Sequence, residues 1–390
     1  MVQDNQLMFD LIRSEILGCS LETNITEISF DRFRTLYEVS KKHDISQLIY
    51  IAIKRNHLLP IAETTSDKQY LQDCTQSYYY SVYRSSKLAS ERQNISKTLS
   101  RAKIKHLFLK GAILRDLYPQ KWMRTSGDID CLVQEDKLFD AVDALRDAGY
   151  VSDGEKHFHD IELDKADVHL ELHFNICEDR FSLDQVLKSV WNNIEETSEC
   201  EMKETPEFFI FHHIAHMAYH ISTGGCGIRP FVDLWVMTMC LPDNKETTRR
   251  LCERAGIDKF YDLVNRMVCV WFENGNHDQE TLSFEKYIIA SSLFGTKDSK
   301  QNVSTIRKNL TKHNIAQHLF LSYDQMKEKY PSLKKWPFLL PVYELYRLVE
   351  KLVKKNQRQY FCSVLQASEN DMDIETLEVM RFSGLDILLK

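Results

Sequence analysis

The chain has 390 residues, of which 43% are hydrophobic and 27% charged, with 12 Gly and 8 Pro. This composition predicts folded domains and excludes collagen-like repeats and low-complexity scaffolds. The net charge of −7 provides no general attraction to the phosphate backbone of nucleic acids. The ten cysteines include no Cys-x-x-Cys pair, so neither a disulfide framework nor a zinc ribbon is indicated.

The N-terminus and the most apolar stretch argue against export and membrane insertion. The first ten residues contain neither a basic leader nor a signal-type apolar run, and the apolar stretch at 208–221 is interrupted by four histidines. We therefore expect a cytoplasmic protein without a membrane span.

Helical patterns dominate the first hundred residues. Apolar residues recur at helical spacing in Leu7–Leu17, Phe30–Tyr37 and Ile45–Ile53, and Asp67–Leu99 is predicted to be one long helix. No residue in this part suggests chemistry, so its predicted role is packing.

From His106 the pattern changes to short strands that alternate with helices. The run HLFLK ends at Gly111, a helical stretch follows, and RTSGDIDCLV is predicted to contain a strand. A helix ending near Gly149 and two strands joined by a turn at Asp164–Asp167 follow. This β-α-β-α-β-β order predicts a small sheet domain.

Helical patterns return after Asn175. The predicted segments are 183–194, 206–221, 229–240, 245–254, 257–273, 282–293, 302–322 and 341–356. The fold class is therefore α+β, with an N-terminal helical region at 1–100, a mixed-sheet domain at 101–176 and a C-terminal helical region at 177–390.

Two aspartates on one predicted strand provide the strongest local signal for chemistry. Asp128 and Asp130 are two residues apart, so they project from the same face of the strand. The later strand Val168–Phe174 places Glu171 on one face, together with His169 and His173. Three carboxylates from neighbouring strands could hold two magnesium ions for in-line phosphoryl transfer.

The segments LKGAILRDLYP, RTSGDIDCLV and VHLELHF between Leu107 and Asn175 resemble the polymerase-β-like nucleotidyltransferase superfamily. More closely, they resemble its branch of uncharacterised nucleotidyltransferase proteins. The resemblance implies that Asp128, Asp130 and Glu171 are the catalytic metal ligands, with Mg²⁺, or Mn²⁺ in its place, as cofactor. It also implies a nucleoside triphosphate, such as ATP, as substrate.

The sequence departs from the superfamily pattern where phosphate is bound. The usual Gly-Ser pair is Gly111-Ala112 here, so a hydroxyl contact to phosphate is missing. The closer branch carries a Lys-Gly pair, which implies that Lys110 supplies a charge while N–H groups after Gly111 cradle the phosphates.

Three residues just before and at the Asp-x-Asp strand complete the candidate nucleotide-binding set. Arg124 and Ser126 precede the acids, where they could contact the triphosphate, and Gly127 adjoins them. For Lys110 and Arg124, a surface charge is an equally weighted alternative.

The histidines of the 208–221 stretch offer a second candidate site. His212, His216 and His220 have the i, i+4, i+8 spacing that could hold zinc, but no acid or cysteine completes a ligand set. Packing histidines are therefore favoured. The resemblance suggests that this helix, with Arg229 and Asp233 downstream, shapes an acceptor pocket.

Three functions remain open at this point. The first is transfer of a nucleoside monophosphate from an NTP to a hydroxyl of a small molecule or protein. The second is a non-catalytic nucleotide-binding or protein-interaction module. The third is a nucleic-acid nucleotidyltransferase, supported only by the segment Lys297–Arg358, which has 14 Lys and Arg against 5 Asp and Glu.

The third function ranks lowest for two reasons. A solvated helical face is the commoner explanation of such a charge run, and aromatic residues interleaved in a helical segment are more often core than base-stacking residues. No membrane partner is expected. The acceptor and the oligomeric state are not predicted.

Overall fold

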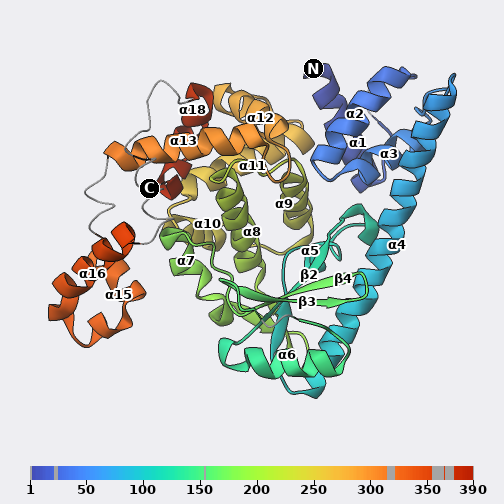
Figure 1. Cartoon of the computed structure of the whole chain (residues 1–390). Helices are drawn as coiled ribbons and strands as arrows, with labels where there is room; N and C mark the ends of the chain where they lie inside the picture. The colour runs from blue at the N-terminus through green and yellow to red at the C-terminus, as the bar shows by residue number, and fades with distance from the viewer. Residues whose placement is uncertain are drawn as a thin grey trace.

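The computed structural model describes residues 2–21, 25–152, 155–313, 321–353, 364 and 373–389 (Figure 1). Within them, six strands form one mixed sheet in the order β3-β4-β2-β1-β6-β5. The strands are β1 His106–Phe108, β2 Asp128–Val133, β3 Asp160–Lys165, β4 Val168–His173, β5 Ile194–Glu196 and β6 Glu201–Glu204. β2 is parallel to β4 and β1 is parallel to β6, whereas the other neighbours are antiparallel. Helices flank this sheet, which confirms the predicted α+β class.

The predicted β-α-β-α-β-β order is present from β1 to β4. A short helix α5 (Gly111–Leu114) separates β1 from β2, and α6 (Leu138–Asp147) separates β2 from β3. The 3₁₀ turns η1 (Lys121–Met123) and η2 (Glu135–Lys137) lie in the connections.

The strands β5 and β6 were not predicted, and here the sequence interpretation was wrong. The segment 183–194 was expected to be one helix, but α7 (Phe181–Leu187) ends early and the turn η3 (Val190–Asn192) leads into β5. β6 is the polar run EMKE, whose place in the sheet comes from backbone pairing with β1 rather than from an apolar pattern. The sheet therefore continues beyond residue 176, and the three-part division of the chain stays a prediction.

The two faces of the sheet differ because side chains alternate along β2 and β4. Ile129 and Cys131 of β2 and Leu170 and Leu172 of β4 belong to one buried cluster, which also contains residues of the long helix α4 (Thr65–Arg101) and of α6. Asp128, Asp130 and Glu171 have the opposite parity and project from the other face. The apolar face is thus covered by α4 and α6, and the acids face the remaining helices.

The N-terminal helices match the predicted segments. They are α1 (Val2–Leu17), α2 (Phe30–Lys42), α3 (Ser46–Arg55) and α4, which lies along the right side of the view in Figure 1. Thr64 begins α4 with a capping box, in which Thr64 and Asp67 each accept a backbone N–H of the other residue.

The C-terminal helices match the predictions at 206–221, 229–240, 245–254 and 257–273, whereas the helices at 323–329 and 374–382 were not predicted. They are α7, α8 (Pro206–Ile221), α9 (Arg229–Cys240), α10 (Lys245–Arg254), α11 (Asp258–Phe272), α12 (Gln279–Ser291), α13 (Lys297–His313), α15 (Tyr323–Lys329), α16 (Leu340–Val353) and α18 (Ile374–Phe382), with the 3₁₀ turns η4 (Pro331–Lys334), η5 (Pro337–Leu339) and η7 (Leu385–Leu389). The predicted helical residues 314–320 and 354–356 lie outside the described residues. The described part of the chain contains no helix with both the length and the apolar character needed to cross a membrane.

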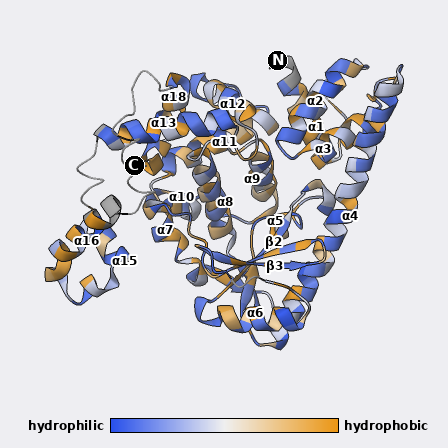
Figure 2. Cartoon of the chain, in the orientation of Figure 1, coloured by the Kyte–Doolittle hydropathy of each residue, from blue (hydrophilic) through white to orange (hydrophobic). Residues whose placement is uncertain are grey.

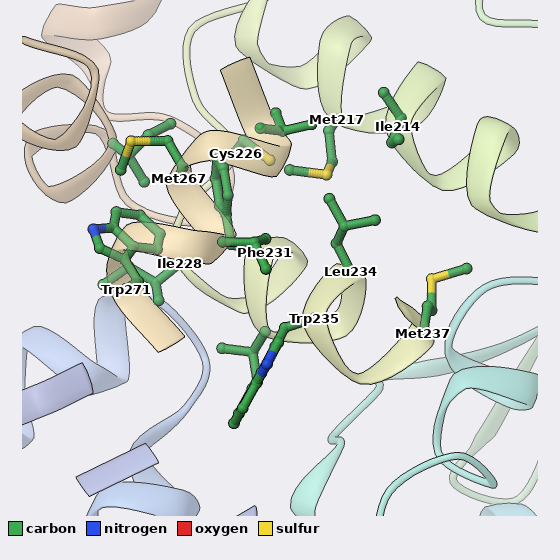
Figure 3. Packing of buried hydrophobic residues seen from close by; sticks show 14 of the residues in the cluster. Ile214, Met217, Cys226, Ile228, Phe231, Leu234, Trp235, Met237, Met267 and Trp271 are labelled. Carbon is green, nitrogen blue, oxygen red and sulfur yellow. The ribbon is translucent and has the colours of Figure 1, made fainter. Parts of the chain in front are cut away.

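The largest buried cluster joins α8, α9 and α11 to the N-terminal helices. Figure 3 shows Phe231 and Leu234 of α9 among these side chains, and the Phe231 ring lies 4.9 Å from that of Trp271. Phe9 of α1 also stacks on Trp271, with the ring centroids 4.5 Å apart. This packing fixes α8 and α9 relative to α1 to α3.

The aromatic residues of the basic segment Lys297–Arg358 were expected to be core residues, and several of them are not. α15 and α16 lie apart from the main body in Figure 1, and they pack on each other through the stacked rings of Tyr330 and Tyr343, 4.6 Å apart. Trp336, Phe338 and Tyr346 are exposed rather than part of a core. Hydrophobic residues are correspondingly visible on α16 in Figure 2.

Candidate active site

The two acid-bearing strands are adjacent and in register. β2 pairs with β4 so that Asp128 lies opposite His169 and Asp130 opposite Glu171. Because paired residues of neighbouring strands project to the same side, the three predicted metal ligands share one face of the sheet. The structure thus brings Asp130 and Glu171 together although 41 positions separate them in the sequence.

Asp130 is the most enclosed of the three acids. Its side chain is 6% exposed, and its Oδ1 lies 3.1 Å from His173 Nε2 and 3.6 Å from Lys110 Nζ. His173 Nε2 also lies 3.3 Å from Glu171 Oε2. The ligand atoms of Asp130, Glu171 and His173 are all within 4.8 Å of one another. Asp128 belongs to no such group of three among the described residues.

The charges at this site perturb one another. Burial raises the pKa of Asp128, and the neighbouring carboxylates of Asp130 and Glu171 raise it further. Burial alone would raise the pKa of Asp130, but Lys110 and His173 hold it well below its usual range. Burial would lower the pKa of Lys110, yet the surrounding carboxylates, Asp130 first, raise it. Hard divalent cations such as Mg²⁺ bind negatively charged oxygen ligands. The three carboxylates therefore fit the magnesium site that the family resemblance implied.

Lys110 occupies a strained turn that directs it toward the acids. Its φ of 43° and ψ of −122° lie in a region that residues with a Cβ rarely adopt. Such strain persists only where the surroundings enforce it, and it is concentrated at functional sites. The N–H of Leu109 donates to the Asp130 carbonyl at 3.0 Å and fixes this turn against β2.

The N–H groups after Gly111, which the sequence implied as a phosphate cradle, are hydrogen-bonded within the turn. The N–H groups of Ala112 and Ile113 donate to the carbonyls of Leu109 and Lys110, at 3.2 and 3.1 Å. The tight turn therefore uses them internally. Lys110 is therefore the candidate phosphate-binding group that remains at this turn.

Ser126 stands close to Gly111 in space, although 15 positions separate them. A Cβ added to Gly111 would lie 3.0 Å from Ser126 Cβ, so only glycine fits without a shift. The buried Arg115 joins the two residues, because its Nε donates to the Gly111 carbonyl at 3.0 Å and its Nη2 donates to Ser126 Oγ. A hydroxyl is therefore present beside the Gly111 turn, supplied by Ser126 instead of by the residue after the glycine.

Arg124 is buried in an ion pair rather than free in the cavity. Its Nε donates to both carboxylate oxygens of Asp233 on α9, at 3.0 and 3.1 Å, and the Tyr118 hydroxyl donates to the same carboxylate at 2.7 Å. The side chains of Arg124 and Asp233 are 7% and 1% exposed. Sequence reasoning did not find this pair, because 109 positions separate its members.

The α8 histidines each have a hydrogen-bond partner, as the packing interpretation predicts. His212 Nδ1 lies 2.9 Å from Glu204 Oε1, His213 Nε2 lies 2.8 Å from the Pro230 carbonyl, and His216 Nδ1 lies 2.6 Å from Glu178 Oε1. His220 Nε2 lies 2.9 Å from His216 Nε2. Among the described residues, no group of three close metal-ligand atoms includes any of them.

A cavity of about 670 Å³ lies between the acid face of the sheet and the helices α8 and α9. It is lined by every residue of the predicted site, namely Lys110, Gly111, Arg124, Ser126, Gly127, Asp128, Asp130 and Glu171. The opposite wall carries His212, His213, His216 and His220, together with Arg229 and Asp233. The volume suits a small organic substrate.

Comparison with known proteins agrees with this geometry. A family model described as "uncharacterised nucleotidyltransferase" matches residues 31–273, more than half of the chain, and the chain belongs to this family. Neither the curated proteins nor the solved structures contain a significant match. The matched residues extend from α2 to α11 and include both acid-bearing strands.

Proposed function

We propose that this member of the nucleotidyltransferase family transfers a nucleoside monophosphate from an NTP to a hydroxyl group of a small molecule or a protein. The observation that carries the proposal is the pair Asp130 and Glu171, in register on parallel strands and facing a cavity of about 670 Å³. The cavity also presents Lys110, a cation for the phosphates.

The proposed reaction forms one bond to phosphorus and breaks one. The acceptor oxygen forms a bond to the α-phosphorus, the bond from that phosphorus to the bridging oxygen breaks, and pyrophosphate and the hydroxyl proton leave. Two bound divalent cations supply activation of the acceptor oxygen and charge neutralisation at the phosphates. Asp128, Asp130 and Glu171 are the residues that hold them.

The remaining residues position the substrate. Lys110 binds phosphate oxygens with its ammonium group, and its strained backbone keeps it near Asp130. His173 orients the Asp130 and Glu171 carboxylates through its Nε2. Arg124 and Ser126 hold the segment before β2 against α9 and the Gly111 turn, so that they position the acids in addition to bordering the nucleotide.

A second cavity adjoins the first. It has a volume of about 520 Å³, lies beside α4, and shares the wall of Arg124, Ser126 and Gly127 with the first cavity. Side-chain hydroxyls line it, including those of Ser77, Tyr80, Ser81, Ser85 and Thr125.

The test is metal-dependent transfer of label from α-³²P-NTPs into extracted small-molecule and protein fractions, with release of pyrophosphate. The variants are Asp128→Asn and Asp130→Asn, each shown to be folded by circular dichroism. Asp140→Asn on the far side of the sheet is the matched control. Equal turnover by wild type and by the two acid variants would contradict the proposal.

A further inference from the structure

The ends of the active-site cavity differ in chemistry. Lys110 and the acids lie at the sheet end, whereas Met217, Cys226, Leu293 and Phe294 line an apolar part. α8 runs between these ends. His212 borders a small neighbouring cavity together with Lys110, and eight helical residues place His220 roughly 12 Å further along α8. This length suits a nucleotide with its phosphates at the sheet and its base near His220.

Three hydrogen-bonded side chains, Glu178, His216 and His220, extend to this apolar part. Glu178 Oε1 contacts His216 Nδ1 at 2.6 Å, and His216 Nε2 contacts His220 Nε2 at 2.9 Å. Burial would raise the pKa of Glu178, but His216 and Lys110 lower it to about 2, so Glu178 is an anion at neutral pH. Burial and then Lys110 lower the pKa of His216, and burial and then His216 lower that of His220 to about 3. Both rings are therefore neutral.

Because both imidazole rings are neutral and Glu178 is an anion, the position of each proton in this series of hydrogen bonds is determined. Because the Glu178 carboxylate only accepts, His216 carries its proton on Nδ1 and has a lone pair on Nε2. His220 must then donate from Nε2, which leaves a lone pair on its Nδ1. His220 Nδ1 has no hydrogen-bond partner among the described residues and is not one of their fully buried unpartnered atoms, and His220 lines the cavity.

An aromatic ring stands beside this acceptor. The Phe294 ring lies 6.2 Å from the His220 ring at an interplanar angle of 65°, and Phe294 is 64% exposed although it lines the cavity. An exposed ring at the edge of a cavity provides a stacking face for a planar group. A nucleobase meets both features, since it stacks by its face and forms hydrogen bonds by its edge.

We propose, on the basis of the proposed function, that His220 Nδ1 accepts a hydrogen bond from an exocyclic amino group of the nucleobase while Phe294 stacks on that base. The substituent at purine C6 or pyrimidine C4 is the one furthest from the sugar, and it reaches the end of the cavity. Adenine and cytosine carry an amino group there, whereas guanine and uracil carry a carbonyl oxygen. The site thus selects ATP and CTP over GTP and UTP, because a carbonyl would face the His220 lone pair.

The test is calorimetric titration of ATP, CTP, GTP and UTP into the full chain with Mg²⁺ and no acceptor. Purine riboside triphosphate, which is ATP without the amino group, is the fifth ligand. We expect ATP and CTP to bind about tenfold more tightly than the other three, the scale of one satisfied hydrogen bond. His220→Ala should remove this preference. Glu178→Gln should reduce it, because an amide can also donate and no longer fixes the tautomers.

The outcomes separate this inference from the proposed function. Binding of all five ligands with equal affinity overturns the inference alone, and so does a preference for ATP that His220→Ala leaves intact. Absence of binding by every nucleotide overturns both. His277→Ala, which removes a histidine that contacts Glu285 outside the cavity, is the control and should keep the wild-type ratio of ATP to GTP affinity.

Discussion

The two walls of the active-site cavity are built on different principles. The sheet wall presents the Asp130 and Glu171 carboxylates, which repel each other and are balanced by Lys110 and His173. The helix wall presents histidines that are each hydrogen-bonded, and its charged residues Asp233 and Arg229 form ion pairs with Arg124 and Asp44. Under the proposed function, the reaction takes place at the sheet wall and α8 recognises the nucleotide.

The sheet wall has the stricter geometry for a physical reason. Strand pairing fixes Asp130 opposite Glu171 through backbone hydrogen bonds, and alternation fixes the face. The helix wall depends on long-range side-chain pairs such as Arg124–Asp233 and Glu178–His216. Its arrangement is therefore more sensitive to single substitutions that leave the backbone intact.

The largest expected effect is on the sheet wall. Asp130→Asn removes one of the carboxylates proposed to hold the divalent cations, and turnover should fall by on the order of 10³-fold, as for loss of a principal charge-stabilising group. Pyrophosphate release measures it. If the variant kept more than a tenth of the wild-type rate, the assignment of chemistry to this wall would be wrong.

On the helix wall, the largest expected effect is on stability. Asp233→Asn leaves the Arg124 guanidinium buried without its counter-ion, which should lower the free energy of unfolding by about 3 kcal/mol. Urea denaturation measures the change. Glu246→Gln, which breaks an exposed ion pair with Arg250, is the matched control and should leave the urea midpoint unchanged. Similar midpoints for Asp233→Asn and wild type would show that α9 does not depend on this pair.

A pH effect is expected where α2 supports the helix wall. His43 is fully buried, its Nδ1 accepts the Ile228 N–H at 3.3 Å, and burial lowers its pKa to about 4. The unfolded chain binds more protons at this residue than the folded chain does, so stability is lost as the pH falls from about 6.5 toward 4.

The matched variant is His43→Asn, whose side-chain oxygen can still accept the Ile228 N–H. Between pH 7 and pH 5, its free energy of unfolding should fall by about 2 kcal/mol less than that of wild type. Chemical denaturation at several pH values measures this difference. Parallel pH profiles would mean that His43 does not carry the effect.

The smallest effect is expected at the apolar part of the cavity. Phe294→Ala removes an exposed ring, so the unfolding midpoint should not change, but nucleotide affinity should fall about tenfold through lost stacking. Calorimetry and thermal unfolding on the same sample measure both quantities. A lowered midpoint with unchanged affinity would assign Phe294 to packing.

Local patterns predicted the sheet wall, whereas contacts between distant segments did not appear in the sequence. The i, i+2 spacing of Asp128 and Asp130 and the alternation around Glu171 were sufficient for the acids, and helical periodicity was sufficient for α8 and α9. β6 was missed because its polar residues carry no apolar pattern. The role of Glu178 had no local signal, since its partner His216 lies 38 positions away.

For Arg124, the sequence identified the residue but not its partner. Its place before the acids predicted a phosphate contact, but the sequence could not show that Asp233 neutralises it. The sequence likewise did not show that the N–H groups after Gly111 form hydrogen bonds within their own turn. Spacing identifies which residues meet, while the partners of a buried charge depend on the whole fold.

The most direct measurement is calorimetric titration of ATP into the protein with Mg²⁺, with EDTA, and into a folded Asp128→Asn/Asp130→Asn variant. We expect binding with Mg²⁺ that disappears both with EDTA and in the variant. Equal binding in all three titrations, or none in the first, would contradict the claim that the sheet acids hold a metal–nucleotide complex.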